Sequence, residues 1–169
     1  MTFDSSSSGS GASIGTTINN GGREEVEEHA TATRTTINNG GVEHIESGGA
    51  AINTTINSGG REVIDAGGNA ANVTFGGPQA ILELGKPSGL IGTISNWHVG
   101  DVIDFLNTAV TRVQENPAHT TLTVTYGTNE TASYGLAGQQ ANTEFKLQSD
   151  GHGGTELILI GIASPHPAM

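Results

Sequence analysis

The feature that most constrains this chain is a short segment that returns at a fixed interval. TTINNGG begins at Thr16 and again at Thr35, TTINSGG begins at Thr54, and a degenerate copy, VTF, begins at Val73. Each start lies 19 residues after the previous one. A fixed period of this length is typical of solenoids, in which stacked coils share one continuous core. At ~4.8 Å per coil, four coils would form a rod about 19 Å long.

Apolar residues occupy the same positions in successive repeats. One column holds Ile18, Ile37, Ile56 and Phe75, and a second holds Val26, Ile45 and Ile64. In the fourth copy the pair Gly76-Gly77 arrives two residues early, so we expect Ile81 to continue the second column after that shift. The Gly pairs mark corners, because residues with a side chain resist positive φ.

The remaining positions of the repeat predict two polar ladders. Alternation along the strand places Thr16, Thr35, Thr54 and Val73 on the inner side with the isoleucines. The next residue then points outward, which gives an exposed ladder of Thr17, Thr36, Thr55 and Thr74. Asn19, Asn38 and Asn57 follow at the corner, where we expect their side-chain amides to hydrogen-bond to one another up the stack.

Composition argues against several classes of function. Aromatic residues make up 4% of the chain, too few for a bulky core but sufficient for thin stacked layers. The formal net charge is −11, which argues against binding to nucleic acid or to anionic membranes. The chain has no cysteine, so it forms neither disulfides nor thiolate metal sites. No apolar run approaches the ~18 residues of a membrane span, so we expect no membrane insertion.

The repeat T-T-I-N-x-G-G, with the V/I that follows it and a second Gly pair, resembles the strand–loop–strand stalk repeats of AIDA-type autotransporter passengers. The resemblance covers roughly residues 14–89. It implies a protein that is secreted or exposed on the bacterial surface, that associates with copies of itself, and that in some members is glycosylated on Ser or Thr. The implied partner is therefore a homo-oligomer, with a cell-surface glycan as the alternative.

The repeats are flanked by segments of different character. Residues 1–13 are rich in Ser and Gly and are interpreted as a flexible leader, and residues 163–169 as a tail. Residues 90–162 carry short runs that predict strands at Leu90–Ser95, Val102–Phe105, Thr120–Tyr126, Glu144–Gln148 and Thr155–Ile160. We expect them to form a small β-sandwich or β-roll module that caps a right-handed, parallel, all-β solenoid over residues 14–89. The runs 92–105 and 150–155 resemble modules of secreted alphaproteobacterial repeat proteins, some of which continue into a Hint self-processing domain.

Two groups of acidic residues are candidate cation ligands. Asp101 and Asp104 lie in a G-D-x-I-D run that resembles calcium-binding β-rolls, but the glycine-rich nonapeptides are missing, so we interpret them as strand and turn residues. Glu24, Glu43 and Glu62 share one repeat position. Alternation places them on the inner side with the second column unless the Gly corner resets it. We expect the corner to reset it and expose them, with a cation site as the alternative.

The sequence favours a non-enzymatic function with no catalytic residues, cofactor or metal. The primary prediction is an extracellular structural or adhesive stalk that self-associates or attaches to surfaces. A second hypothesis is a spacer that presents a downstream Hint or effector domain. A third is a module that binds glycans, or ice through the threonine ladder. The loop Asp150–Thr155 is interpreted as a hairpin turn rather than a phosphate-binding loop, because no Lys and no helix follow it.

Overall fold

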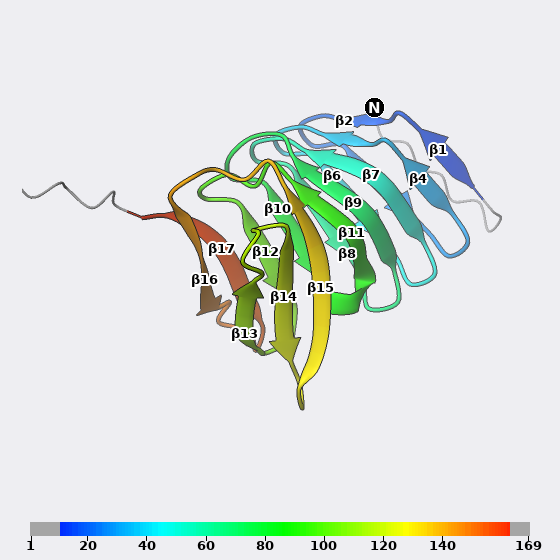
Figure 1. Cartoon of the computed structure of the whole chain (residues 1–169). Coiled ribbons are helices and arrows are strands. Elements are labelled where there is room, and N and C mark those ends of the chain that lie inside the picture. Colours follow the sequence, from blue (N-terminus) through cyan, green and yellow to red (C-terminus); the bar gives the residue numbers. More distant parts are fainter. Residues whose placement is uncertain (1–10, 163–169) are drawn as a thin grey trace, which may run out of the picture.

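A computed structural model of the chain describes residues 11–162 and shows an almost entirely β structure. Parallel coils stack into a solenoid of about five turns, which confirms the predicted fold class (Figure 1). The strands form two sheets, which we call sheet A and sheet B. Each coil contributes one strand, or two short strands in line, to sheet A and one strand to sheet B. Residues 1–10 of the predicted leader and the predicted tail 163–169 lie outside the described residues, whereas Ala12 and Ser13, at the end of the predicted leader, already belong to a strand.

The two sheets run along the whole stack. Sheet A contains β1 (Ala12–Ile14), β2 (Thr17–Ile18), β4 (Thr31–Thr33), β5 (Thr36–Ile37), β7 (Ala50–Ile56), β9 (Asn69–Phe75), β11 (Leu90–Ser95), β15 (Glu130–Ala137), β14 (Thr121–Tyr126) and β13 (Val110–Glu115). Sheet B contains β3 (Arg23–Val26), β6 (Val42–Ile45), β8 (Arg61–Ile64), β10 (Ile81–Leu84), β12 (Val102–Phe105), β17 (Thr155–Gly161) and β16 (Thr143–Ser149). A single 3₁₀ turn, Pro87–Gly89, leads into β11.

The two glycines of each corner have different physical roles, as the second coil shows. Gly40 has φ of 70°, a conformation that residues with a side chain adopt only at a cost. Gly41 does not need positive φ, but an added Cβ would lie 2.6 Å from the carbonyl oxygen of Ile18 in the coil below. The pair therefore turns the chain and allows two coils to approach closely.

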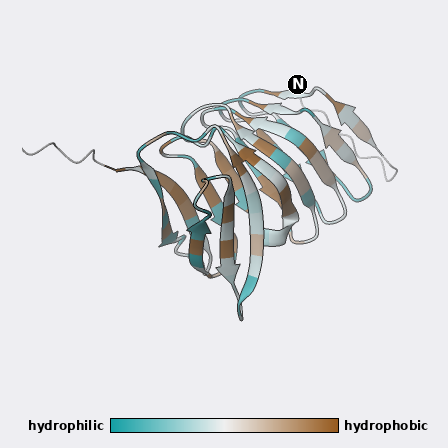
Figure 2. Ribbon diagram, viewed as in Figure 1, coloured by the Kyte–Doolittle hydropathy of each residue, from teal (hydrophilic) through white to brown (hydrophobic). Residues whose placement is uncertain are grey.

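The core is built from the columns that the period predicts. Ile18, Ile37, Ile56 and Phe75 are Cα partners in successive strands of sheet A and are buried. Thr35, Thr54 and Val73 are also buried on the inner side, as alternation predicts. Hydrophobic bands accordingly recur from strand to strand along the stack (Figure 2). Each layer is thin, which explains why few aromatic residues are needed.

The predicted register of the fourth coil was wrong. Leu84, and not Ile81, pairs with Ile64 and continues the second apolar column, while Ile81 pairs with Arg61. The corner is one residue longer than in the earlier repeats, rather than two shorter. Gln79 takes positive φ of 64° there and its carbonyl accepts the hydrogen bond from the Gly59 amide. The Gly pair of the earlier coils has therefore been replaced by Gln79 and Ala80.

Residues beyond the sequence repeats continue both sheets. Strands β11 and β12 pair in parallel with β9 and β10, so the stack extends past the last recognisable repeat. Antiparallel strands then finish each sheet: β15, β14 and β13 in sheet A, and β17 and β16 in sheet B. Trp97 is fully buried between Phe75 and Phe145, with ring centroids 5.5 Å and 4.9 Å apart. Within residues 11–162, no helix has the length and hydrophobicity needed to cross a membrane.

Candidate functional site

The asparagine column forms a hydrogen-bonded ladder at one corner of the stack. The Asn38 side-chain amide donates to Asn19 Oδ1 at 2.9 Å, and Asn57 donates to Asn38 Oδ1 at 2.8 Å. Asn19 is exposed and the other two are half-buried. The ladder ends at Gly76, where an added Cβ would lie 2.0 Å from Asn57 Oδ1. The ladder therefore links three coils along the surface and is a structural feature.

The outer side of the solenoid part of sheet A carries almost no charge. Arg34 is its only charged residue within the segments 12–18, 31–37, 50–56, 69–75 and 90–95. The predicted outward threonines lie here: Thr17 is exposed, and Thr36, Thr55 and Thr74 are half-buried. We call the outward side chains of these five segments the neutral face.

Exposed isoleucines form a column on the neutral face that the sequence did not predict. Ile14, Thr33, Ile52, Ala71 and Ile91 are Cα partners in successive strands. The residues that follow these in the chain form a second column. In it, Arg34, Asn53 and Asn72 have the left-handed backbone conformation, with φ of about 60°. Simple alternation back from the outward Thr55 would place Ile52 inside, but the left-handed Asn53 reverses the side on which Ile52 lies. Asn tolerates this conformation better than most residues, and Asn53 and Asn72 are the sequence signal that was missed.

The outer side of sheet B is charged, in contrast to the neutral face. Its outward residues include Arg23, Glu25, His44, Arg61, Glu83, Asp104 and Glu156. Arg61 and Glu83 form an ion pair with an N–O distance of 2.6 Å. The two faces of the rod therefore present very different surfaces to a partner.

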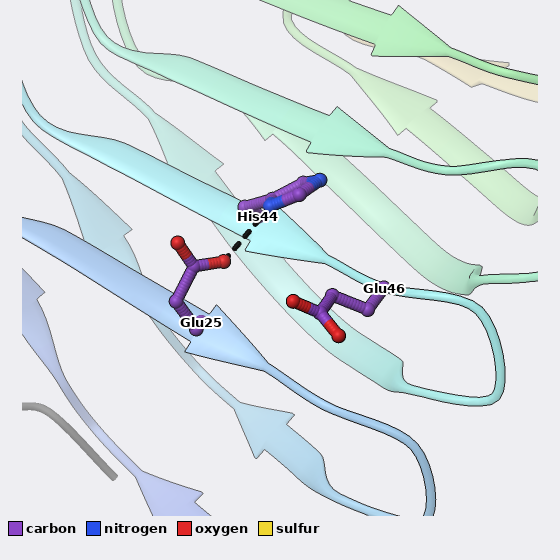
Figure 3. Close-up of side chains that lie close together, drawn as sticks. All are labelled: Glu25, His44 and Glu46. Atoms are coloured by element: carbon purple, nitrogen blue, oxygen red, sulfur yellow. Dashed lines mark hydrogen bonds and ion pairs between the residues drawn. The ribbon is translucent and has the colours of Figure 1, made fainter. Parts of the chain in front are cut away.

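Three side chains on this charged side lie close enough to hold a metal ion (Figure 3). Glu25, His44 and Glu46 bring one ligand atom each within 4.8 Å of one another. His44 Nδ1 lies 2.8 Å from Glu25 Oε2, and Nε2 lies 3.0 Å from Asp65 Oδ1. Arg23 also contacts Glu25 and His44. A guanidinium at this position competes with a cation, so we interpret the group as an ion-pair network across three coils.

The ion pairs favour the charged form of His44. Partial burial by itself lowers the pKa of His44, but the hydrogen bonds to Asp65 and Glu25 outweigh that effect and raise it. A protonated ring donates from both nitrogens, which matches one carboxylate on each side. His44 therefore bridges the carboxylates of the first and third coils, and in its protonated form it attracts both of them.

The expectation that the glutamate column is exposed was wrong. Glu24, Glu43 and Glu62 are Cα partners in β3, β6 and β8 and point into the core, with exposed fractions of 8%, 0% and 0%. The strands β3, β6 and β8 alternate without interruption from these residues to Val26, Ile45 and Ile64, so the corner before them does not reset the pattern. In the fourth coil the same position is occupied by Leu82.

The three carboxyl groups of this column differ in how many of their oxygens accept hydrogen bonds. The Ser13 hydroxyl donates to Glu24 at 2.5 Å, and the Thr54 hydroxyl donates to Glu43 at 3.0 Å. One oxygen of Glu43 and both oxygens of Glu62 are buried without a partner. Burial, supported by the neighbouring Glu24 charge, raises the pKa of Glu43 to about 7. Burial and the Glu43 charge raise the pKa of Glu62 well above its ordinary range. Burial therefore favours the protonated form of both Glu43 and Glu62.

The structure does not bring Asp101 and Asp104 together as a calcium site. Asp101 is buried and accepts hydrogen bonds from the Ala80 amide at 3.0 Å and the His98 amide at 2.7 Å, so it fastens the β11–β12 loop to the fourth coil. Asp104 lies on the opposite side of β12, where it is half-buried and its Oδ1 has no hydrogen-bond partner among the described residues. Burial, followed by the charges of Asp150, Glu83 and Glu156, raises the pKa of Asp104 to about 6.

The Asp150 loop connects the antiparallel strands β16 and β17 as a turn. Asp150 Oδ1 accepts hydrogen bonds from the amides of His152 at 2.6 Å and Gly154 at 2.8 Å. These backbone donors, which a phosphate-binding loop would direct at its ligand, are occupied by the loop's own carboxylate. The geometry therefore gives this loop a structural role.

Comparisons with known proteins give limited similarity. No family model matches the chain, and no curated protein matches it. Among solved structures, the chain is similar to the crystal structure of a TibC-catalysed, hyper-glycosylated fragment of TibA, with 33% identity and a TM-score of 0.40. The match covers 53% of this chain and 39% of that chain, so this chain spans well under half of the length of the protein it matches.

Proposed function

We propose that the chain is a non-catalytic stalk module of a secreted or surface-exposed bacterial protein, and that it attaches to surfaces and to copies of itself. The observation that carries this proposal is the uninterrupted stack of about five coils, tied together by parallel strands and by the asparagine ladder. Such a stack is a stiff, quasi-one-dimensional element that is suited to spacing and contact. The resemblance of the repeat to AIDA-type passenger repeats supports the same role.

The distribution of reactive and sugar-binding groups supports a role without catalysis. Trp97 and Tyr134 are fully buried and Tyr126 is only 7% exposed, so none of them is available to stack on a sugar. The buried carboxyl groups of Glu43 and Glu62 are sealed in the core and do not face a groove. Glycoside chemistry needs a pair of carboxylates that flank an accessible bond, which these groups do not provide.

The chain path also favours a spacer as a second candidate function. The described chain starts in β1 at one end of the stack and ends after β17 at the other (Figure 1). Anything joined to the two ends is therefore held apart by the length of the stack. A spacer of this kind is compatible with the adhesive role, because a stalk also projects what it carries.

A bead assay tests the adhesive proposal. Beads coated with the chain through one terminus should clump with one another and should be retained on a glycan-coated or plain polymer surface more than beads coated with an inert protein. Beads that neither clump nor adhere above that control would contradict the adhesive role.

The spacer is tested separately, by measuring the distance between two fluorescent proteins fused to the two termini of the chain.

A further inference from the structure

We propose that the neutral face is the surface through which two copies of this chain dock, side by side and antiparallel. This inference rests on the proposed function and names the surface and the partner that serve it. The partner is a second copy of the chain, because the charge and the shape of the neutral face both favour contact with the same face of another copy.

Charge is the first reason. The chain carries a formal net charge of −11, so two copies repel each other wherever their charged sides meet. The outer side of sheet B concentrates carboxylates, including Glu25, Glu83 and Asp104. The neutral face has only Arg34 in its five segments. Two copies therefore approach at the lowest electrostatic cost with their neutral faces together and their charged sides in solvent.

Shape is the second reason. Ile14, Ile52 and Ile91 are exposed by 67%, 37% and 59%, and they alternate along one column with the smaller Thr33 and Ala71. A two-fold axis that lies between the two faces and runs parallel to the strands, midway between the rungs of Ile52 and Ala71, places two of the three isoleucines opposite small residues of the second copy. Ile52 then faces Ala71, and Ile91 faces Thr33. Large residues opposite small ones interdigitate, as at dry interfaces between paired sheets, and a two-fold contact is self-complementary.

The size of the face sets the strength of the contact. Five rungs at ~4.8 Å and strands of seven residues at ~3.3 Å give a flat area of roughly 20 Å by 23 Å per copy. The total area buried by two copies is then at the low end of the range for specific interfaces, where contacts are weak and transient. Docking should therefore depend on concentration, and become strong only when many copies are held on one surface.

Sedimentation velocity from low micromolar to millimolar concentration tests the proposal. The wild-type chain should pass from monomer to dimer, and added salt should strengthen the dimer because it screens the repulsion between copies. Ile52→Glu should weaken dimerisation at least tenfold. Val42→Glu is the matched control, because Val42 lies on the outer side of sheet B between Arg23 and Arg61 and gains the same charge. It should dimerise like wild type. Ile91→Glu, at a more exposed rung, decides the question if Ile52→Glu fails to fold.

The other results overturn the proposal in distinguishable ways. A chain that stays monomeric at every concentration refutes self-docking and also removes self-association from the proposed function. Dimerisation that survives both isoleucine variants refutes this face and leaves the proposed function intact. A monomer whose retention on a neutral glycan matrix is lost in Ile52→Glu would show that a glycan occupies the face, which also overturns the proposal.

Discussion

Replacing Glu62 by Gln tests the buried carboxyl column. Glu62 is fully buried, neither of its oxygens has a hydrogen-bond partner, and Glu43 lies directly beside it in the column. A glutamine has nearly the same shape, cannot ionise, and has an amide group that can donate to the unpartnered oxygen of Glu43. We therefore expect Glu62→Gln to increase the free energy of unfolding above neutral pH, by about 1–3 kcal/mol, since a buried polar group without a partner costs about that much.

The sign of the pH dependence follows from the raised pKa values. A carboxyl group with a raised pKa in the folded state holds its proton there and releases it on unfolding, so stability falls as pH rises from the unfolded to the folded pKa. For Glu43 the rise from 4.5 to about 7 corresponds to a loss on the order of 3 kcal/mol across that window. Glu62 contributes in the same direction, and so does Asp104, whose pKa is raised to about 6.

Urea unfolding at a series of pH values between about pH 5 and pH 8 measures this effect. The wild-type chain should lose stability steadily across the range, and Glu62→Gln should lose less and be the more stable of the two at the upper end. Glu28→Gln, at an exposed position, is the control and should reproduce the wild-type slope. A wild-type stability that rises with pH, or a Glu62→Gln variant that is less stable at high pH, would refute the reasoning.

Three further substitutions test the ladder, the corner and the loop clamp by urea unfolding. Asn38→Ala removes both hydrogen bonds of the ladder and should cost about 1 kcal/mol, because the side chain is only half-buried, whereas Thr36→Ala on the neutral face should stay within about 0.5 kcal/mol. Equal effects would show that the ladder does not contribute. Gly41→Ala forces a Cβ against the Ile18 carbonyl and should cost about 1–3 kcal/mol; a neutral result would mean that the coils are not so close. Asp101→Ala leaves the amides of Ala80 and His98 without this partner and should cost about 1–3 kcal/mol for each; an unchanged free energy of unfolding would show that the carboxylate does not fasten the loop.

The repeat predicted the fold because each rung places the same side chain in the same environment. The isoleucine column, the inward threonines and the outward Thr17, Thr36, Thr55 and Thr74 all follow from one period and simple alternation. Several strands beyond the repeats were also predicted; β11 and β12 have the expected bounds. β13 and β15 were missed, and both pair with the strongly alternating β14. β13 has no clear alternation in sequence, whereas in β15 the buried Ala132, Tyr134 and Leu136 do alternate with other residues and were a signal that could have been used.

The errors arise where a single residue decides on which side of the sheet its neighbours lie. At the corner before Glu62 the alternation within the strand decides, so the carboxyl group is buried although its charge favours solvent. At Asn53 the left-handed backbone reverses the alternation, so Ile52 is exposed although its hydrophobicity favours the core. Asn53 and Asn72 mark the second of these reversals in the sequence, because Asn tolerates the left-handed conformation, whereas nothing comparable distinguishes the corner before Glu62. The extra residue before Ala80 similarly shifts the fourth coil, because the whole corner is remodelled around Gln79.

Small-angle X-ray scattering over a dilution series tests the central claim, that this chain is a rod that associates through its side. At the lowest concentration the scattering should match a single stack with residues 11–162 in the arrangement described. As concentration rises, the radius of gyration of the cross-section should increase while the length stays nearly constant, and Ile52→Glu should abolish that increase. Growth in length at constant cross-section would contradict the account, because it would show that copies stack end to end through the open edge strands β1 to β3.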